Sequence, residues 1–233
     1  LDNSGLSSLA DKDGTRFVSP STDGGVICIH RVARTHSAGE SSGPQTLEAG
    51  ADAQLETTAF ADLPNAKVNT ACRVDQATGD LVLQQSVISP QPGVWGVSFR
   101  VANIPLDMNI LVPGNSGMKL TTASPVASMT FEYPISWEAQ LVVIEGEGRG
   151  FYLWAEDEVG LYKRLQVTRN SDGWQLALIG INYAPFDELK TCRSPTWRLN
   201  VYEGDWRVPA RRYREWSERH FAPVKVEAQR PSW

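Results

Sequence analysis

The stretch YLWAEDEVGLYKR, residues 152–164, holds three carboxylates and two cations among large apolar and aromatic side chains. Two carboxylates on either side of a glycosidic bond can act as acid and base, but their carboxyl groups must then lie roughly 5–9.5 Å apart across the sugar. In a strand, alternate side chains point to opposite faces, so Trp154 and Glu156 share one face and Asp157 lies on the other. Because Glu156 and Asp157 diverge, we expect no acid–base pair here.

Two other interpretations of this stretch remain open. In the first, the acidic residues end a strand, and Lys163 or Arg164 on the returning strand pairs with one of them across the hairpin. In the second, Trp154 together with Glu156 or Asp157 offers a flat apolar surface and a hydrogen-bond acceptor. Such a combination suits the C–H face and the hydroxyl groups of a sugar.

A second aromatic candidate is Trp137, in YPISWEAQ (133–140), which follows a proline and precedes a strand. Two interpretations of Trp137 are open: it is an exposed aromatic side chain at a loop rim beside Glu138, or it is a core residue. For Trp95, Trp174 and Trp197, which lie within strand patterns, we predict core positions. The candidate carbohydrate-binding residues are therefore Trp137, Glu138, Trp154, Glu156, Asp157 and Lys163.

Other chemistries find little support in the residue types. Of the three histidines, only His30 with a remote glutamate could form the acid–base pair of a sandwich-type sugar epimerase. A serine nucleophile also lacks support, because no Gly-x-Ser-x-Gly sequence stands between a predicted strand and a predicted helix. Histidine, cysteine and aspartate do not cluster as transition-metal ligands, whereas carboxylate and backbone oxygens could hold calcium without a sequence trace. We predict no catalytic residue, no metal and no cofactor in this chain.

The elements that would position these residues are mainly strands. Runs of four to nine alternating apolar and polar residues, separated by Gly, Asp, Asn and Pro, are typical of antiparallel sheet. At least nine strand candidates precede residue 183, too many for one open sheet, so an all-β fold with a two-sheet antiparallel β-sandwich is predicted for residues 1–204. The strand candidates are 25–32, 66–75, 80–88, 94–101, 128–134, 139–146, 150–157, 161–168, 173–181 and 197–204, and the polar stretch 36–54 is predicted to be a loop.

After residue 204 the apolar period becomes helical. Residues 205–221 space four side chains by four, three and three positions along one helical face, with Asp205 as the N-cap; these are Trp206, Ala210, Tyr213 and Trp216. We expect this aromatic stripe to pack on the sandwich and the arginines to fall largely on the other faces. Residues 222–233 contain two prolines and no core pattern, so we interpret them as an extended linker towards a missing domain.

Composition limits the partners. The 27 acidic and 22 basic residues give a formal charge of -5, without a basic block, which argues against nucleic acid and an anionic membrane surface and favours a neutral ligand. No apolar run approaches the ~18 residues of a transmembrane helix. Cys28, Cys72 and Cys192 are far apart, and we predict buried thiols. An extracellular or periplasmic location is slightly favoured.

The C-terminal half, about residues 112–233, resembles a known family. The succession FEYPISWEAQLVVIEGEGRGFYLWAEDEVGLYKRL, INYAPFDE, WRLNVYEGDWRVPARRYREW and QRPSW is similar to the N-terminal β-sandwich region of bacterial glycoside-hydrolase-like proteins of the endo-α-N-acetylgalactosaminidase clan. The resemblance implies a galactose-mutarotase-like supersandwich, a helix with the pattern seen here at Gly204, Asp205, Trp206, Ala210, Tyr213 and Trp216, and then a catalytic (β/α)8 barrel. No catalytic residue is carried over to this chain, because the barrel would follow it.

The leading hypothesis is therefore a non-catalytic β-sandwich domain of a glycoside hydrolase, which supports a C-terminal catalytic barrel and helps to shape its carbohydrate cleft. One alternative is a stand-alone carbohydrate-binding module that presents exposed Trp137 and Trp154. Another is an enzyme of the mutarotase or epimerase kind, which requires His30 to converge with a carboxylate. The partners expected are a carbohydrate and the barrel of the same parent protein.

Overall fold

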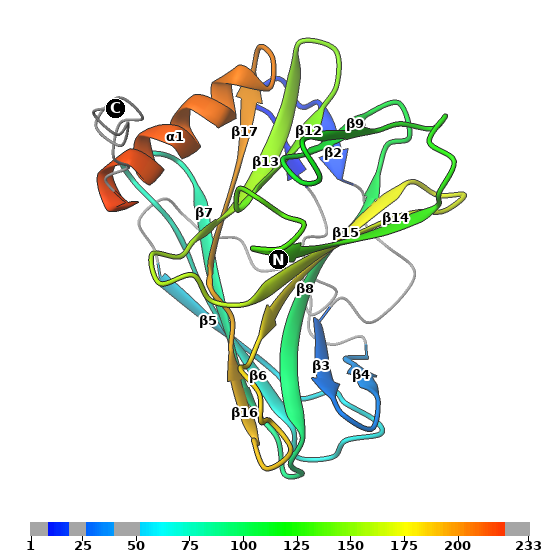
Figure 1. The fold of residues 1–233 in the computed structure, drawn as a ribbon, viewed down its shortest axis with the longest axis vertical. Coiled ribbons are helices and arrows are strands. Elements are labelled where there is room, and N and C mark those ends of the chain that lie inside the picture. Colours follow the sequence, from blue (N-terminus) through cyan, green and yellow to red (C-terminus); the bar gives the residue numbers. More distant parts are fainter. Residues whose placement is uncertain (1–8, 19–26, 40–51, 222–233) are drawn as a thin grey trace, which may run out of the picture.

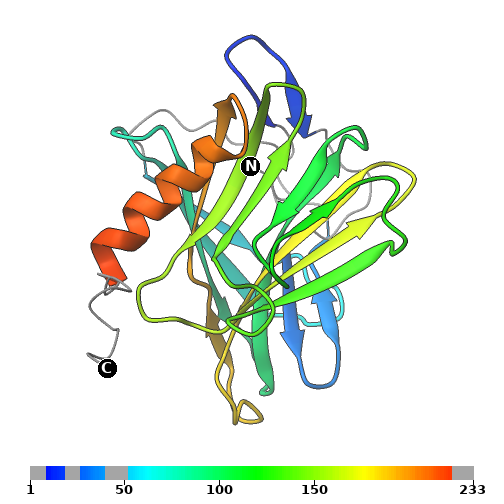
Figure 2. The same ribbon diagram turned by 45° about the horizontal axis from the view of Figure 1, so that its top comes forward.

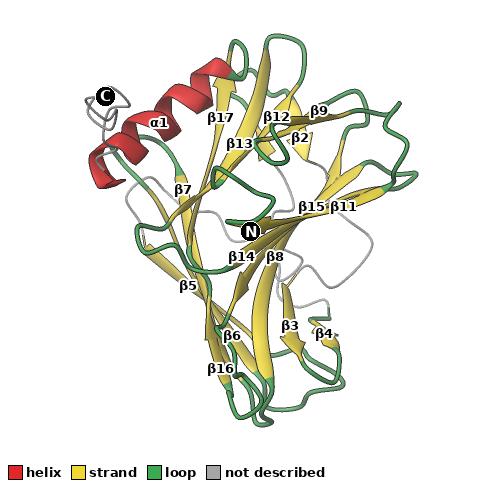
Figure 3. Ribbon diagram, viewed as in Figure 1, coloured by secondary structure: helices red, strands yellow, loops and turns green. Residues whose placement is uncertain are grey.

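A computed structural model describes residues 9–18, 27–39 and 52–221 of the chain. It confirms the predicted all-β, two-sheet antiparallel sandwich with one C-terminal helix (Figure 1). Every described regular element other than this helix is a strand (Figure 3). No helix in the described part of the chain has the length and apolar character needed to cross a bilayer.

The larger sheet has nine strands in the order β10-β9-β12-β13-β17-β7-β6-β5, with β16 also paired to β7. Its strands are β5 (Asp52–Thr57), β6 (Lys67–Val74), β7 (Leu81–Ile88), β9 (Asn109–Val112), β10 (Met118–Leu120), β12 (Leu141–Glu145), β13 (Arg149–Glu156), β16 (Thr191–Arg193) and β17 (Thr196–Glu203).

The smaller sheet has six strands in the order β11-β14-β15-β8-β3-β4. Its strands are β3 (Ile27–Arg31), β4 (Thr35–Ser37), β8 (Val94–Ile104), β11 (Ser128–Tyr133), β14 (Lys163–Arg169) and β15 (Trp174–Ile181). A separate two-stranded ribbon joins β1 (Leu9–Ala10) to β2 (Arg16–Val18).

The two large sheets pack face to face around one main core. Phe151, Leu153 and Ala155 of β13 point into this core, while Tyr152 and Trp154 point to the outer face of the nine-stranded sheet. Burying a large apolar side chain contributes about 1.5–3 kcal/mol relative to leaving it exposed. The period of two along β13 therefore supplies both the sandwich core and the outer face on which the helix sits.

Short strands were the part of the fold that the residue pattern did not predict. The strands β9 and β10 lie in a segment for which no strand was predicted, and β4 and β5 lie at the two ends of the predicted loop 36–54. Residues 40–51 of that loop are outside the described residues. The three or four residues of β4, β9 and β10 offer too few alternations to separate a strand from a loop, so pairing with neighbouring strands decides their structure.

The helix α1 (Arg207–Phe221) packs on the outer face of the nine-stranded sheet, against β12 and β17 (Figure 2). Asp205 Oδ1 accepts a hydrogen bond from the N–H of Arg207 at 2.9 Å, the contact expected of an N-cap. The rings of Tyr213 and Trp216 lie 5.4 and 5.6 Å from the ring of Trp154. Trp206, predicted for the same stripe, precedes α1 and is 44% exposed. The predicted linker 222–233 lies outside the described residues.

The cysteines occupy the interior, as predicted. Cys28, Cys72 and Cys192 are all buried. Burial raises the pKa of Cys192 to about 12, so this thiol stays protonated and unreactive at neutral pH.

Candidate functional site

The outer face of the nine-stranded sheet carries a polar groove beside α1, made of two adjoining hollows. The sheet hollow lies over β5, β6 and β7 and has a volume of about 400 Å³. The helix hollow lies between α1 and the sheet and has a volume of about 330 Å³. Glu156, the last residue of β13, lines both, so the two hollows adjoin at this residue and are together called the groove.

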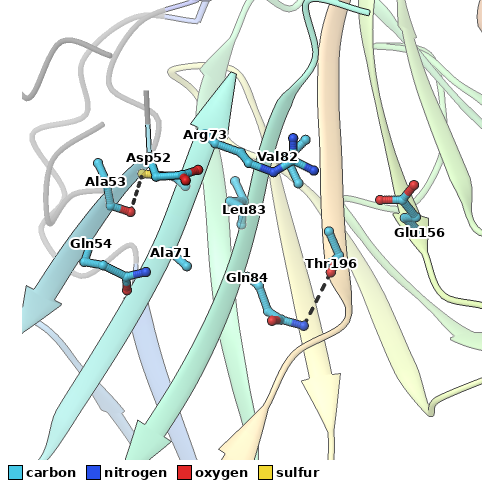
Figure 4. Close-up of a pocket in the computed structure, with 11 residues that line it drawn as sticks. Asp52, Ala53, Gln54, Ala71, Arg73, Val82, Leu83, Gln84, Glu156 and Thr196 are labelled. Carbon is cyan, nitrogen blue, oxygen red and sulfur yellow. Dashed lines mark hydrogen bonds between the residues drawn. The ribbon is translucent and has the colours of Figure 1, made fainter. Parts of the chain in front are cut away.

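The sheet hollow has Ala71 of β6 as its floor (Figure 4). The register places Ala71 between Gln54 of β5 and Gln84 of β7, and the short alanine side chain leaves a gap between the two longer ones. Gln84 Nε2 donates to Thr196 Oγ1 at 3.4 Å, and Arg193 Nη2 donates to Gln84 Oε1 at 2.6 Å, which fixes the amide. Amide groups both donate and accept hydrogen bonds, as the hydroxyl groups of a neutral polar ligand require.

The helix hollow is built on Asp80, which is 0% exposed and directly precedes β7. Asp80 Oδ1 accepts hydrogen bonds from the Tyr152 hydroxyl at 3.0 Å, from Asn200 Nδ2 at 2.8 Å and from Arg212 Nη2 at 3.0 Å. Its Oδ2 accepts from Arg198 Nη1 at 3.2 Å. Burial and the neighbouring Asp80 carboxylate raise the pKa of Tyr152, so its hydroxyl remains a donor. Because Arg212 belongs to α1 and the other donors to the sheet, Asp80 ties the helix to the sandwich.

Arg198 of β17 holds three carboxylates of the groove. Its Nε lies 3.0 Å from Glu156 Oε2, and its Nη1 lies 2.9 Å from Asp75 Oδ2 and 3.2 Å from Asp80 Oδ2. Hydrogen bonding to Arg198 holds the pKa of Asp75 below its usual range. One guanidinium group therefore fixes the positions of these three carboxylates in the groove.

The structure brings two of the predicted site residues, Trp154 and Glu156, to this groove. It also confirms that Glu156 and Asp157 diverge, because Glu156 lines the groove and Asp157 is buried in the interior. Trp154 is only 6% exposed, since Tyr213 and Trp216 of α1 cover its ring. Its flat face is therefore occupied by the protein itself.

Trp137 and Glu138 lie away from the groove. Trp137 is 0% exposed and belongs to the main core, with its Nε1 donating to the carbonyl oxygen of Leu141 at 3.0 Å. The exposed loop-rim interpretation of Trp137 is wrong, and the core interpretation is right. Glu138 Oε1 accepts a hydrogen bond from the N–H of Ser116 at 3.0 Å, which holds a turn. The exposed aromatic pair that the binding-module alternative required is absent, because Trp137 and Trp154 are both buried.

Asp157 and Lys163 form a buried ion pair, with Lys163 Nζ 2.7 Å from Asp157 Oδ2. Their side chains are 2% and 0% exposed, and the ammonium group also lies 3.9 Å from the centre of the Tyr133 ring. Asp157 additionally accepts hydrogen bonds from the N–H groups of Val159 and Leu161. Burial lowers the pKa of Lys163, and the Asp157 carboxylate opposes that shift. This pair confirms the predicted contact across the hairpin, but it lies where no sugar can reach it.

His30 has two hydroxyl partners. Its Nδ1 lies 2.9 Å from Thr35 Oγ1 and its Nε2 lies 3.0 Å from Ser98 Oγ. Burial, together with the charges of Arg100 and Arg164, lowers the pKa of His30 to about 4. The pair of His30 with a glutamate, on which the epimerase alternative depended, does not form among the described residues.

This low pKa makes stability depend on pH. In the unfolded chain His30 binds a proton near pH 6.5, whereas in the folded chain it binds one only near pH 4. Between pH 6.5 and pH 4, unfolding therefore takes up a proton, and lowering the pH favours the unfolded state. We expect the free energy of unfolding to fall by about 3 kcal/mol from pH 6.5 to pH 4, at about 1.4 kcal/mol for each pKa unit. Urea titrations across this range should show the slope, and His30→Gln should remove it. Asp75 also has a lowered pKa, but its protonation affects stability only below about pH 4, the usual pKa of an aspartate. A slope that remains above about pH 4 in His30→Gln would therefore contradict the assignment of the slope to His30.

Sequence reasoning missed Asp80, Arg198 and Arg212, the residues that organise the helix hollow. The alternation in β17 did carry a signal, because Arg198 sits between the inward-facing Trp197 and Leu199. Arg212 precedes Trp216 by four positions and so shares its helical face, although we predicted the arginines to lie largely on other faces. Trp174 and Trp197 are core residues as predicted, whereas Trp95 is only half-buried.

Among the described residues, no group of three or more His, Cys, Asp and Glu side chains is arranged to hold a metal ion.

Comparison with known proteins relates the fold to larger enzymes. No family model matches the chain, and no curated protein sequence matches it. Among solved structures, the α-N-acetylgalactosaminidase NagBb from Bifidobacterium bifidum, in complex with GalNAc, matches 90% of this chain with a TM-score of 0.66 at 13% identity. The chain shares its fold with part of that enzyme. The match covers 35% of the NagBb chain, and a match to the galactosidase domain of the α-galactosidase-sucrose kinase AgaSK, with a TM-score of 0.51 at 10% identity, covers 77% of this chain and 30% of that one.

At these identities the likeness shows the fold alone. The chain spans about a third of the length of the solved chains that it matches. The sandwich expected from the resemblance is therefore present, and it corresponds to a minor part of chains with glycosidase activity.

Proposed function

We propose that this chain is a non-catalytic β-sandwich domain of a glycoside hydrolase, which supports a (β/α)8 catalytic barrel and helps to shape its carbohydrate cleft. The observation that carries the proposal is the fold match between 90% of this chain and 35% of an α-N-acetylgalactosaminidase. Nearly the whole sandwich and helix thus correspond to a minor part of a glycosidase chain. The substrate class suggested for the parent protein is an α-linked N-acetylgalactosaminide or galactoside, from the activities of the matched enzymes.

The groove supports the proposal that this domain contributes to binding and that catalysis lies elsewhere in the parent protein. Arg198 holds three of the carboxylates in the groove, so these side chains are already engaged within the domain. Gln54 presents an amide group beside Ala71, which suits the hydroxyl groups of a sugar in a neighbouring cleft. The Gln84 amide, in contrast, is already bonded to Thr196 and Arg193. The groove thus serves as a polar wall, and bond cleavage belongs to another part of the parent protein.

The proposal predicts a difference between this chain and the full product of its gene. The 233-residue chain should release no p-nitrophenol from p-nitrophenyl α-N-acetylgalactosaminide or α-galactoside above a buffer blank. The full gene product should hydrolyse one of them, because it would add the catalytic barrel. Sequencing the gene beyond the codon of Trp233 shows whether that barrel is encoded.

A control variant identifies any activity of the chain itself. Glu156→Gln removes the carboxylate common to both hollows. Turnover by the 233-residue chain that disappears in Glu156→Gln would assign catalysis to the groove and contradict the proposal. A gene without a following barrel would contradict it as well.

A further inference from the structure

Exposed apolar side chains gather at one end of the six-stranded sheet. Among the described residues, the four most exposed large hydrophobic side chains are Val159 at 77%, Ile135 at 69%, Val32 at 57% and Tyr183 at 56%. Single exposed apolar residues are normal on a protein surface, whereas a contiguous group of them marks an interaction site. The position of these four residues in the sheet decides which case applies.

The strand register places three of them at the same end of the sheet. Tyr133 of β11 pairs with Lys163 of β14, which pairs with Gly180 of β15, so the segments beyond these residues leave the sheet side by side. Ile135 follows β11, Val159 precedes β14 and Tyr183 follows β15. The Tyr183 hydroxyl donates to the carbonyl oxygen of Gly160 at 3.3 Å, which joins two of these segments directly.

A groove of about 340 Å³ extends the same surface towards β3. It is lined by Val32, Trp95, Tyr162, Arg164, Ile181 and Phe186. Trp95 reaches this groove because the pairing of β3 with β8 skips it, with His30 opposite Gly96 and Arg31 opposite Val94. Such a bulge turns a side chain to the other face of its strand. The core position predicted for Trp95 is therefore wrong, and its ring belongs to an outer apolar surface.

The last turn of α1 ends at the edge of this surface. His220 Nδ1 lies 2.8 Å from Glu158 Oε1, the residue next to Val159. Phe221, at the end of α1, is itself 42% exposed. Figure 2 shows the loop between β13 and β14 beside the C-terminal end of α1. The chain therefore leaves the described structure next to Val159.

We propose that this strand-end surface, formed by Val32, Trp95, Ile135, Val159, Tyr162, Tyr183 and Phe186, is the docking surface for the domain that follows α1 in the same polypeptide. The inference rests on the proposed function, in which that domain is the catalytic barrel. The occupant is expected to present an apolar face, with a protruding apolar side chain in the groove lined by Trp95 and Phe186.

A covalently joined domain fits this surface better than a second copy of the chain does. A domain attached after residue 233 is joined to α1, whose last turn contacts Glu158, through the 12 residues 222–233, so the connection holds it at an effective concentration in the millimolar range. A separate molecule must instead lose its translational and rotational freedom, which costs an estimated 4–15 kcal/mol. A surface of a few apolar side chains is sufficient for the first case and small for the second.

The test compares two valine variants in the full gene product. Val159→Glu places a charge at the most exposed apolar position of the surface, and Val126→Glu, at an exposed valine preceding the opposite end of β11, is the matched control. The docked and undocked forms are distinguished by the rate of limited proteolysis between α1 and the next domain. We expect Val159→Glu to raise this rate at least about tenfold, because a charge buried without a partner opposes docking, and we expect Val126→Glu to leave it unchanged.

Further measurements separate this inference from the proposed function. In the 233-residue chain both variants should unfold at the wild-type urea midpoint, because exposed positions change stability little. A full gene product that is an active glycosidase, but whose proteolysis is unaffected by Val159→Glu, overturns the docking surface and leaves the proposed function intact. If Val159→Glu releases a following domain that has no glycosidase activity, the docking surface stands and the proposed function is overturned. A further outcome is that the 233-residue chain sediments as a dimer that Val159→Glu dissociates. That result would assign the surface to a second copy of the chain and would overturn the inference.

Discussion

Replacing Lys163 with methionine should lower the free energy of unfolding by about 3–5 kcal/mol, the cost of leaving one member of a buried ion pair without its partner. Methionine has a similar length and removes only the charge and the donor groups. Asp157 would then keep its hydrogen bonds from Val159 and Leu161 but would lose Lys163, 2.7 Å away, in a site from which water is excluded. Urea denaturation of the Lys163→Met variant and of the wild-type chain at pH 7 measures the difference.

A surface lysine provides the matched control. Lys67 Nζ lies 3.1 Å from Glu56 Oε1, but these side chains are 47% and 48% exposed. We expect Lys67→Met to change stability by less than about 1 kcal/mol, because solvent screens exposed pairs. The double variant Lys163→Met with Asp157→Asn should recover much of the loss, since it removes the unpaired charge as well. Equal effects of Lys163→Met and Lys67→Met would show that burial of the first pair contributes nothing.

The alternation of side chains predicted the direction of most strand residues correctly. Lys163 occurs in phase with the apolar Leu165 and Val167 of β14, and the structure places all three inside. The sequence therefore contained the signal that Lys163 points inward, but it did not show which carboxylate it meets. That partner is decided by the turn between β13 and β14, which brings Asp157 back towards Lys163.

The residues that the pattern placed wrongly are those whose surroundings come from distant parts of the chain. Trp137 follows a proline in a loop, and only the packing of the two sheets shows that the loop folds into the core. Trp95 follows a strand pattern, but one skipped residue in the pairing with β3 reverses its direction. A one-residue change in register moves a side chain to the opposite face, and periodicity within one strand does not reveal it.

The groove itself depends on contacts between residues far apart in the sequence. Asp80 and Arg212 are separated by 132 positions and lie on a hairpin and a helix. The acidic residue at the end of a turn and the arginine in a helix are each unremarkable in sequence, because both residue types are common at exposed positions. Their roles follow from the packing of α1 on β13 and β17, which the aromatic stripe predicted only in outline.

Asp80→Ala should have an effect as large as that of Lys163→Met, lowering the free energy of unfolding by about 3–5 kcal/mol, because it leaves buried donors and two arginines without their acceptor. The four donors belong to Tyr152, Arg198, Asn200 and Arg212. Since Arg212 is the donor that belongs to α1, hydrogen exchange in the backbone of the helix should accelerate more than exchange in β14 or β15, which pair in the other sheet. Urea denaturation and residue-resolved exchange measure these two effects.

Glu218→Ala separates loss of docking from loss of helix stability. Glu218 forms an exposed pair with Arg214 on the same helix, and we expect its loss to change stability little and to leave exchange in the sheet unchanged. Asp80→Ala could instead accelerate hydrogen exchange equally in α1 and in both sheets. Asp80 would then be a general core residue and would not specifically hold the helix on the sheet. The distinction bears on function, because α1 connects the sandwich to the chain that follows. If the proposed barrel follows this chain, a helix fixed by Asp80 sets the position of the sandwich relative to the barrel, and a loosely held helix leaves that position to the proposed docking surface.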